Sequence, residues 1–134
     1  MVVHVDGGAR GNPGPAGIGV VVSLPDGTEL DRANDYIGEA TNNVAEYRAV
    51  LLGIERAKAA GAKKLQLVND SELVARQLVG EYKVKHAGLR PLHAESLDAL
   101  DDFEQWSIRS VRREANDLAD QLVNDAIDAK APTT

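Results

Sequence analysis

The chain has 134 residues, of which 43% are hydrophobic, and its formal net charge is −6. This length suits one domain, and the composition allows a buried core and excludes an intrinsically disordered chain. Cysteine is absent, which excludes disulfides, a thiolate nucleophile and a zinc–cysteine site, and a cytoplasmic location is expected for the same reason. No segment approaches the roughly 20 apolar residues of a membrane span, so we expect no membrane partner.

The chain begins with two apolar strands. Residues 2–6 predict a short β-branched strand that ends at Asp6, followed by a loop rich in glycine and proline over residues 7–17. Residues 17–23 predict a second strand that is almost wholly apolar, which is typical of a central position in a sheet. A Pro25-Asp26-Gly27 turn joins it to a more polar third strand over residues 28–37, which we place at a sheet edge.

The rest of the chain alternates helices and strands. The apolar period changes from two to about 3.6 at Val44, Tyr47 and Leu51, which predicts a helix over residues 43–60. A right-handed crossover through this helix makes the first and fourth strands parallel. We therefore expect an α/β fold with a mixed five-stranded sheet flanked by helices. The remaining expected elements are a strand at 64–70, a helix at 71–80, a loop at 81–90, a helix at 91–103, a strand at 105–111 and a helix at 116–129.

Two carboxylates follow strands that we expect to be parallel neighbours. Asp6 ends the first strand and Asp70 ends the fourth, so the two side chains would face each other about 5 Å apart, across one strand spacing. A divalent cation such as Mg²⁺ or Mn²⁺ would relieve their repulsion, since carboxylate oxygens are its preferred ligands. Taken singly, Asp6-Gly7 is a common turn and Asp70-Ser71 is a common helix start. The pair together favours an ion site.

Two further acids lie in predicted helices. Glu46 falls in the first turn of its helix, and the Asn43-x-x-Glu46 spacing also fits a capping box. Asp120 is one of several acids in the last helix, and helical position alone does not single it out.

Four segments then carry a family resemblance. "DGGARGNPGPAG", "TNNVAEYRA", "NDSELV" and "REANDLADQL" occur in the order and spacing of type I ribonuclease H, which the chain resembles over nearly its whole length. The resemblance is to compact bacterial and archaeal forms, and to forms in which this domain precedes a phosphatase-like domain. It implies a sheet order of 3-2-1-4-5 with the second strand antiparallel to its neighbours. It also implies a ribonuclease H domain over residues 1–129, with residues 130–134 as a flexible tail or the start of a linker.

The resemblance implies an activity and a set of metal ligands. The reaction is hydrolysis of the RNA strand of an RNA–DNA hybrid, which leaves 5′-phosphate and 3′-hydroxyl ends. Two Mg²⁺ ions, for which Mn²⁺ can substitute, assist it. By resemblance Asp6 bridges both ions, Glu46 and Asp70 hold the ion on the water side, and Asp120 is a more mobile ligand. A monomer is expected, alone or as one domain of a longer chain.

The resemblance also places residues on the substrate, with three departures from the family. Asn12, Asn42 and Asn43 would read ribose, although a turn at Asn12 and a helix cap at the other two are compatible roles. Many members carry a histidine before the last helix and a long basic helix as a substrate handle, and tryptophan is common where Tyr82 stands. Here Arg113 is the nearest substitute for the histidine, and the short segment with Lys83, Lys85, His86 and Arg90 is a reduced handle. Thr41 resembles the residue that grips a phosphate of the DNA strand.

Other interpretations are less favoured. A junction resolvase of related fold is disfavoured by "TNNVAEY", and a catalytically silent hybrid-binding domain is disfavoured by the presence of all four acids. His4 shares a strand face with Asp6, but we expect it to be packed or solvated rather than to bind metal.

Overall fold

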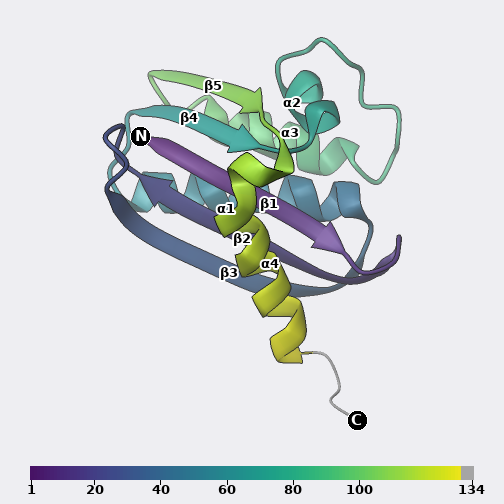
Figure 1. The fold of residues 1–134 in the computed structure, drawn as a ribbon. Helices are drawn as coiled ribbons and strands as arrows, with labels where there is room; N and C mark the ends of the chain where they lie inside the picture. Colours follow the sequence, from purple (N-terminus) through teal and green to yellow (C-terminus); the bar gives the residue numbers. More distant parts are fainter. Residues whose placement is uncertain (131–134) are drawn as a thin grey trace.

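The sheet order follows the expected pattern. The computed structural model describes residues 1–130. One sheet runs in the order β3-β2-β1-β4-β5, with β2 antiparallel to both neighbours and β4 parallel to β1 and β5 (Figure 1). The predicted fold class is therefore confirmed. The strands are β1 (Val2–Ala9), β2 (Gly14–Ser23), β3 (Glu29–Ala40), β4 (Lys64–Asn69) and β5 (Gln105–Ser110).

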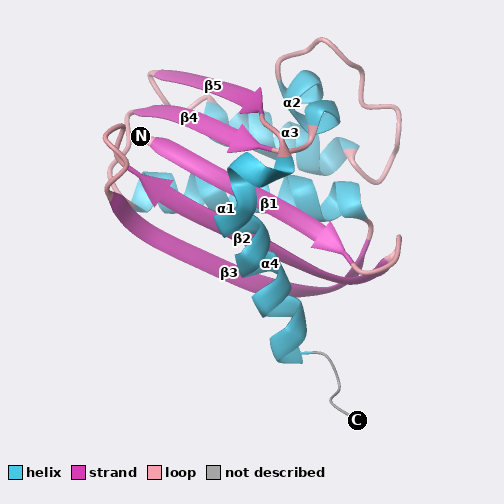
Figure 2. Cartoon of the chain, in the orientation of Figure 1, coloured by secondary structure: helices cyan, strands magenta, loops and turns pink. Residues whose placement is uncertain are grey.

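Helices cover both faces of the sheet. One face carries α1, with α2 and α3 beside it, and α4 crosses the other face over β1, β2 and β3 (Figure 2). The main core lies on the α1 face, where Val3 and Val5 of β1 and Val20 of β2 pack with Tyr47 and Ile54 of α1. The helices are α1 (Asn42–Ala59), α2 (Glu72–Leu78), α3 (Arg90–Leu100), a short 3₁₀ helix η1 (Arg113–Asn116) and α4 (Asp117–Lys130).

The first hairpin is longer than the sequence predicts. β1 continues past Asp6 to Ala9, and β2 begins at Gly14, so only residues 10–13 form the connecting loop. The prediction that the first strand ends at Asp6, before a loop over residues 7–17, is wrong. Dense glycine is typical of loops, but in this hairpin glycine serves close packing of helices on strands.

Three strand glycines leave room for helix backbone. A Cβ at Gly7 would overlap the Ala45 carbonyl of α1, and a Cβ at Gly19 would lie 2.6 Å from the Ala119 carbonyl oxygen of α4. At Gly17 the corresponding distance, to the Val123 carbonyl oxygen of α4, would be 2.9 Å. A side chain at any of these positions would push a helix off the sheet. Glycine therefore lets α1 and α4 approach β1 and β2 closely from opposite faces.

Two predictions concern the ends of the chain and the membrane. Among residues 1–130, no helix combines the length and the apolar character needed to cross a membrane. Lys130 belongs to α4, and the rest of the predicted tail, residues 131–134, lies outside the described residues.

Candidate active site

Asp6 and Asp70 stand opposite each other where two strands stop pairing. The parallel pairing of β1 with β4 runs from Val2–Gln66 to His4–Val68. Asp6 and Asp70 each lie two residues beyond the last pair. Asp6 remains within β1, where it pairs with Gly19 of β2, so β1 holds its backbone rigidly. The end of the β1–β4 ladder thus leaves a gap that has one carboxylate on each side.

Glu46 reaches this gap from α1, which covers the face of the sheet opposite α4. Gly7 has no side chain that would collide with the α1 backbone at Ala45 and Glu46, so the Gly7 N–H comes close to the Glu46 carboxylate. Glu46 is only 7% exposed, and its Oε2 atom is buried without a hydrogen-bond partner among the described residues. A buried carboxylate oxygen without a partner is costly unless a cation approaches it.

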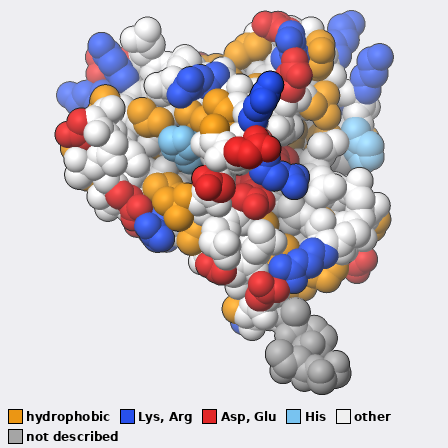
Figure 3. Space-filling model, in the orientation of Figure 1, with side chains coloured by type: hydrophobic (Ala, Val, Ile, Leu, Met, Phe, Trp, Pro, Cys, Tyr) orange, Lys and Arg blue, Asp and Glu red, His pale blue; other side chains and the backbone are white. Residues whose placement is uncertain are grey.

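Three carboxylates converge and a fourth adjoins them. One oxygen each from Asp6, Glu46 and Asp70 lies within 4.8 Å of the other two. Asp120, in the first turn of α4, is within hydrogen-bonding reach of Asp6. All four residues line a cleft of about 550 Å³. Figure 3 shows acidic side chains gathered at the centre of this face, beside the start of α4.

Burial and mutual repulsion make the ionised cluster unstable without a cation. Asp6 is 4% exposed, and burial, then the charges of Glu46 and Asp70, raise its pKa to about 10. Burial and the charge of Asp70 raise the pKa of Glu46 to about 8, although hydrogen bonds from Asp6 and Gly7 oppose the shift. A group of carboxylates with such shifts is typical of a functional site.

Asn116 fixes α4 to the strand that carries Asp6. Its side-chain nitrogen donates to the Val5 carbonyl oxygen at 2.8 Å, and the residue is 2% exposed. Asn116 is the last residue of η1, directly before α4, and Asp120 follows it by four residues, in the first turn of α4. The hydrogen bond therefore holds Asp120 beside Asp6. Sequence analysis missed Asn116, although this spacing within "REANDLADQL" could have indicated it.

The structural alternatives for Glu46 and Asp70 are excluded by the helix caps. Thr41 caps α1, where its hydroxyl accepts from the Val44 N–H at 3.2 Å, so the alternative of an Asn43–Glu46 capping box does not hold. The prediction that Glu46 falls in the first turn is also wrong, because the first turn contains no acid. Ser71 caps α2, where its hydroxyl accepts from the Val74 N–H at 3.3 Å. Asp70 therefore does not cap the helix that follows it.

The predicted ribose-reading residues lie together at the start of α1. The Asn12 side-chain oxygen accepts from the Asn42 N–H at 3.0 Å, and the Asn42 side-chain oxygen accepts from the Ala9 N–H at 2.9 Å. These bonds fasten the β1–β2 loop to α1. Asn42 and Asn43 line the cleft, whereas Asn12 and Thr41 lie outside it.

The predicted basic residues separate into two places. Arg113 lines the cleft, where its Nε atom lies 3.9 Å from an Asp70 oxygen, and its side chain is 77% exposed. Lys83 and Lys85 lie outside the cleft, on the loop between α2 and α3. Arg10 and Asn124 also line the cleft and were not predicted as site residues. Asn124 follows Asp120 by four residues, a spacing that could have indicated it.

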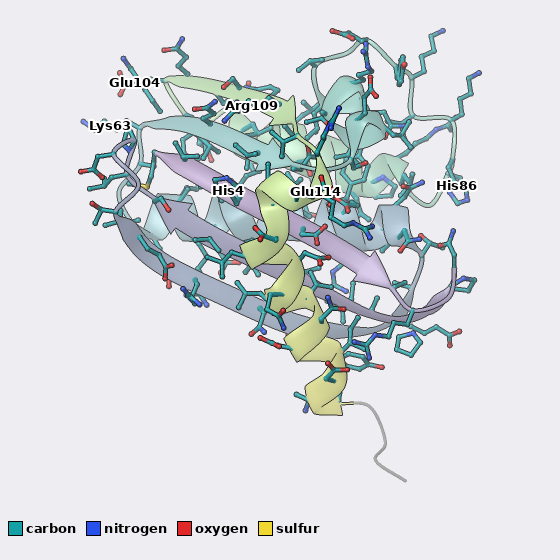
Figure 4. The ribbon with its side chains drawn as sticks, in the orientation of Figure 1. His4, Lys63, His86, Glu104, Arg109 and Glu114 are labelled. Carbon is teal, nitrogen blue, oxygen red and sulfur yellow. The ribbon has the colours of Figure 1, made fainter. Side chains whose placement is uncertain are left out.

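His4 stands apart from the carboxylates. Among residues 1–130, the group that could hold a metal ion consists of Asp6, Glu46 and Asp70. Figure 4 shows His4 on β1 and Arg109 on β5. Burial, then the charge of Arg109, lowers the pKa of His4.

The donor set fits a hard divalent cation. It consists of carboxylate oxygens alone, with one buried oxygen that lacks a partner, and it contains neither nitrogen nor sulfur. Oxygen donors of this kind suit Mg²⁺ and Mn²⁺ better than zinc or copper.

Comparison with a family model and with solved structures identifies the family of this chain. A family model described as "reverse transcriptase-like" matches residues 4–126. The crystal structure of RNase H1 from the halophilic archaeon Halobacterium salinarum matches with a TM-score of 0.93 at 40% identity, over 96% of this chain and 97% of that one. The chain belongs to the type I ribonuclease H family of hydrolases. The predicted family is thus confirmed.

Two further type I ribonuclease H structures are similar. The N-terminal RNase H domain of Rv2228c from Mycobacterium tuberculosis has a TM-score of 0.93 and 44% identity, over 96% of this chain and 93% of that one. LC11-RNase H1, solved in complex with an RNA/DNA hybrid, has a TM-score of 0.91 and 42% identity, over 96% of each chain.

The curated relatives are longer than this chain. It matches 36% of the length of Rv2228c, which is named a bifunctional protein, and 63% of the ribonuclease HI of Halobacterium salinarum.

Proposed function

We propose that this chain hydrolyses the RNA strand of RNA–DNA hybrids with the help of two divalent metal ions. The observation that carries the proposal is the convergence of three carboxylate oxygens within 4.8 Å, with Asp120 beside them. The likeness to LC11-RNase H1, which was solved with an RNA/DNA hybrid, supports this class of substrate.

The four carboxylates would hold the ions. Asp6 adjoins the other three acids and would contact both ions, with Glu46 and Asp70 on the water side and Asp120 as a more mobile ligand. When bound, the metal ions, Mg²⁺ or Mn²⁺ in its place, supply an activated water and neutralise charge at the scissile phosphate. One water is added across the bond between phosphorus and the 3′-oxygen, so the products carry 5′-phosphate and 3′-hydroxyl ends. Arg113, beside Asp70, adds positive charge at the rim of the cleft.

Asparagine amides at the start of α1 would distinguish RNA from DNA. The oxygens of Asn12 and Asn42 accept from backbone N–H groups, and within residues 1–130 no hydrogen bond holds their amide nitrogens. Those nitrogens, with Asn43, can donate to 2′-hydroxyl groups in the minor groove, which mark an RNA strand. Thr41 lies beside them, where it would meet a phosphate of the DNA strand.

The domain bounds, the oligomeric state and the cellular location stay predictions. We propose a monomeric domain over residues 1–129 that works alone or within a longer chain, as the greater length of its relatives suggests. The cytoplasmic location expected from the cysteine-free sequence also stays a prediction.

The test is cleavage of matched duplexes. An RNA–DNA hybrid, an RNA duplex and a DNA duplex of one sequence, each labelled on one strand, are incubated with the protein in Mg²⁺ or in chelator. We expect cleavage of the RNA strand of the hybrid in Mg²⁺ only, and an intact DNA duplex. Cleavage of the DNA duplex at a comparable rate would point to a nuclease with a different substrate. Binding of the hybrid without cleavage in Mg²⁺ would favour a silent binding domain.

A further inference from the structure

The loop between α2 and α3 carries the reduced basic handle. It holds Lys83, Lys85 and His86, all exposed, and Arg90 follows the loop as the first residue of α3. Figure 3 shows Lys and Arg side chains projecting from the molecule over this loop, and Figure 4 shows His86 on its outer part. Among the described residues, no acid lies within ion-pair distance of Lys83 or Lys85. Their ammonium groups are therefore available to phosphates.

Arg90 points its guanidinium at the loop's own backbone. Its Nε atom donates to the Val84 carbonyl oxygen at 3.2 Å, and its Nη2 atom donates to the Lys85 carbonyl oxygen at 3.4 Å. Two consecutive carbonyls therefore share one planar fork of donors. This geometry suits arginine and not lysine, because a lysine ammonium is a single point of charge on a flexible stem.

The buried Gln77 side chain contacts the carbonyl of the preceding loop residue, Lys83. The Gln77 side-chain nitrogen lies 3.5 Å from the Lys83 carbonyl oxygen, and Gln77 is 5% exposed. The Tyr47 hydroxyl donates to the Gln77 side-chain oxygen at 2.6 Å, and His93 Nε2 lies 3.0 Å from the Gln77 carbonyl oxygen. Tyr47 follows Glu46 in α1, so these contacts connect the loop to the helix that supplies one of the clustered acids.

We propose that Arg90 is a positioning residue for hybrid binding, which sets the loop backbone so that Lys83 and Lys85 face the phosphates. This inference rests on the proposed function. A loop that is already ordered in the free protein loses less conformational entropy when the substrate binds. Arg90 strengthens binding through the two lysines and is not itself a phosphate contact.

Two substitutions at Arg90 distinguish positioning of the loop from a direct contact with phosphate. Arg90→Lys keeps the charge and removes the fork, whereas Arg90→Gln removes both. Affinity for a labelled hybrid is measured in Mg²⁺ in an Asp6→Asn background, which keeps the hybrid intact, at several salt concentrations. Arg32→Gln, an exposed arginine paired with Glu29 on β3, is the matched control. Thermal melts verify that each variant is folded.

If Arg90 positions the loop, a lysine at position 90 should not preserve the affinity for the hybrid. Both Arg90 variants should lose affinity to a similar extent, on the order of tenfold. In a protein whose Lys83 and Lys85 are already alanine, either Arg90 substitution should cause little further loss of affinity. The salt slope should fall by more than the roughly 0.9 expected for one lost phosphate contact on duplex DNA. In the cleaving protein KM should rise more than kcat falls. Amide hydrogen exchange in residues 83–86 should quicken in both variants without any substrate.

Four results would overturn the inference, the last of them through the proposed function. Retained affinity in Arg90→Lys, with a slope change of about 0.9 in Arg90→Gln, would make Arg90 a direct phosphate contact. Full additivity with the two lysine substitutions, or unchanged exchange in residues 83–86, would also contradict it. If the parent protein with Lys83 and Lys85 intact binds the hybrid no better than a DNA duplex, the proposed function itself fails, and the inference fails with it.

Discussion

At the scale of single residues, Asp6 occupies a position that suits a metal ligand and not an isolated carboxylate. Burial and the charges of Glu46 and Asp70 hold its pKa at about 10, far above the value near 4 of an exposed aspartate. Without a cation, the native state at neutral pH must keep a proton on Asp6 that the unfolded chain releases. This difference lowers stability in the absence of metal.

We expect Asp6→Asn to be inactive and more stable than the wild type in chelator. Asparagine has the same shape without the charge, so the free energy of unfolding at pH 7.5 should rise by at least about 1.4 kcal/mol, the equivalent of one pKa unit. Mg²⁺ should stabilise the wild type by RT ln(1 + [L]/Kd) and the variant less. Thermal melts of both proteins, in chelator and in Mg²⁺, measure these effects.

Asp98→Asn, on the exposed side of α3, is the control for this substitution and should change neither melt. If Asp6→Asn melts below the wild type in chelator, Asp6 has a structural role and the repulsion in the cluster is overstated.

Gly7 and Gly8 form a natural pair for testing close packing. A Cβ at Gly7 would overlap the Ala45 carbonyl, whereas a Cβ at Gly8 would meet only Val123 Cγ1 at 3.8 Å. Gly7→Ala should therefore lower the free energy of unfolding by about 1–3 kcal/mol, as overpacking does, and displace Glu46 with α1. Gly8→Ala should have little effect on stability. Chemical denaturation of both variants tests this, and equal effects would contradict it.

At the scale of elements, a hydrogen bond from Asn116, the residue directly before α4, helps to align α4 with β1. Asn116→Ala removes the donor to the Val5 carbonyl oxygen and leaves that acceptor buried, which should cost about 1–3 kcal/mol of stability. Because Asp120 would lose its fixed place beside Asp6, kcat should fall more than KM rises. Gln121→Ala, an exposed amide on the same helix, is the control. Hybrid cleavage kinetics and denaturation measure both effects, and an unchanged kcat would show that Asn116 does not place Asp120.

Sequence periodicity predicted the elements well and their ends less well. Val44, Tyr47 and Leu51 identified α1 through their helical period, and Val44 and Tyr47 pack in the core, whereas Leu51 lies outside it. The same reasoning ended β1 at Asp6, because a local sequence does not show that Gly7 and Gly19 lie under helices that come later in the chain. The close approach of two elements is a tertiary property.

At the scale of the whole molecule, the candidate site exists only because three layers meet. Asp6 belongs to the sheet, Glu46 to the helix on one face, and Asp120 to the helix on the other. Residue pattern alone could pair Asp6 with Asp70 at neighbouring strand ends. It could not select Asp120 from the acids of the last helix, and the family resemblance was needed for that. The partner of Asn116, the Val5 carbonyl oxygen, lies in a distant segment of the chain, and no local pattern identifies that partner.

The chemistry of the cleaved ends tests the central claim most directly. The RNA strand of a hybrid is labelled, digested in Mg²⁺, and its new ends are identified by mass spectrometry. Hydrolysis at the carboxylate cluster by a metal-activated water predicts 5′-phosphate and 3′-hydroxyl ends on the RNA strand, with the DNA strand intact. Ends that carry a 2′,3′-cyclic phosphate would show that the neighbouring 2′-hydroxyl is the nucleophile, which would contradict a metal-assisted hydrolase built on Asp6, Glu46, Asp70 and Asp120.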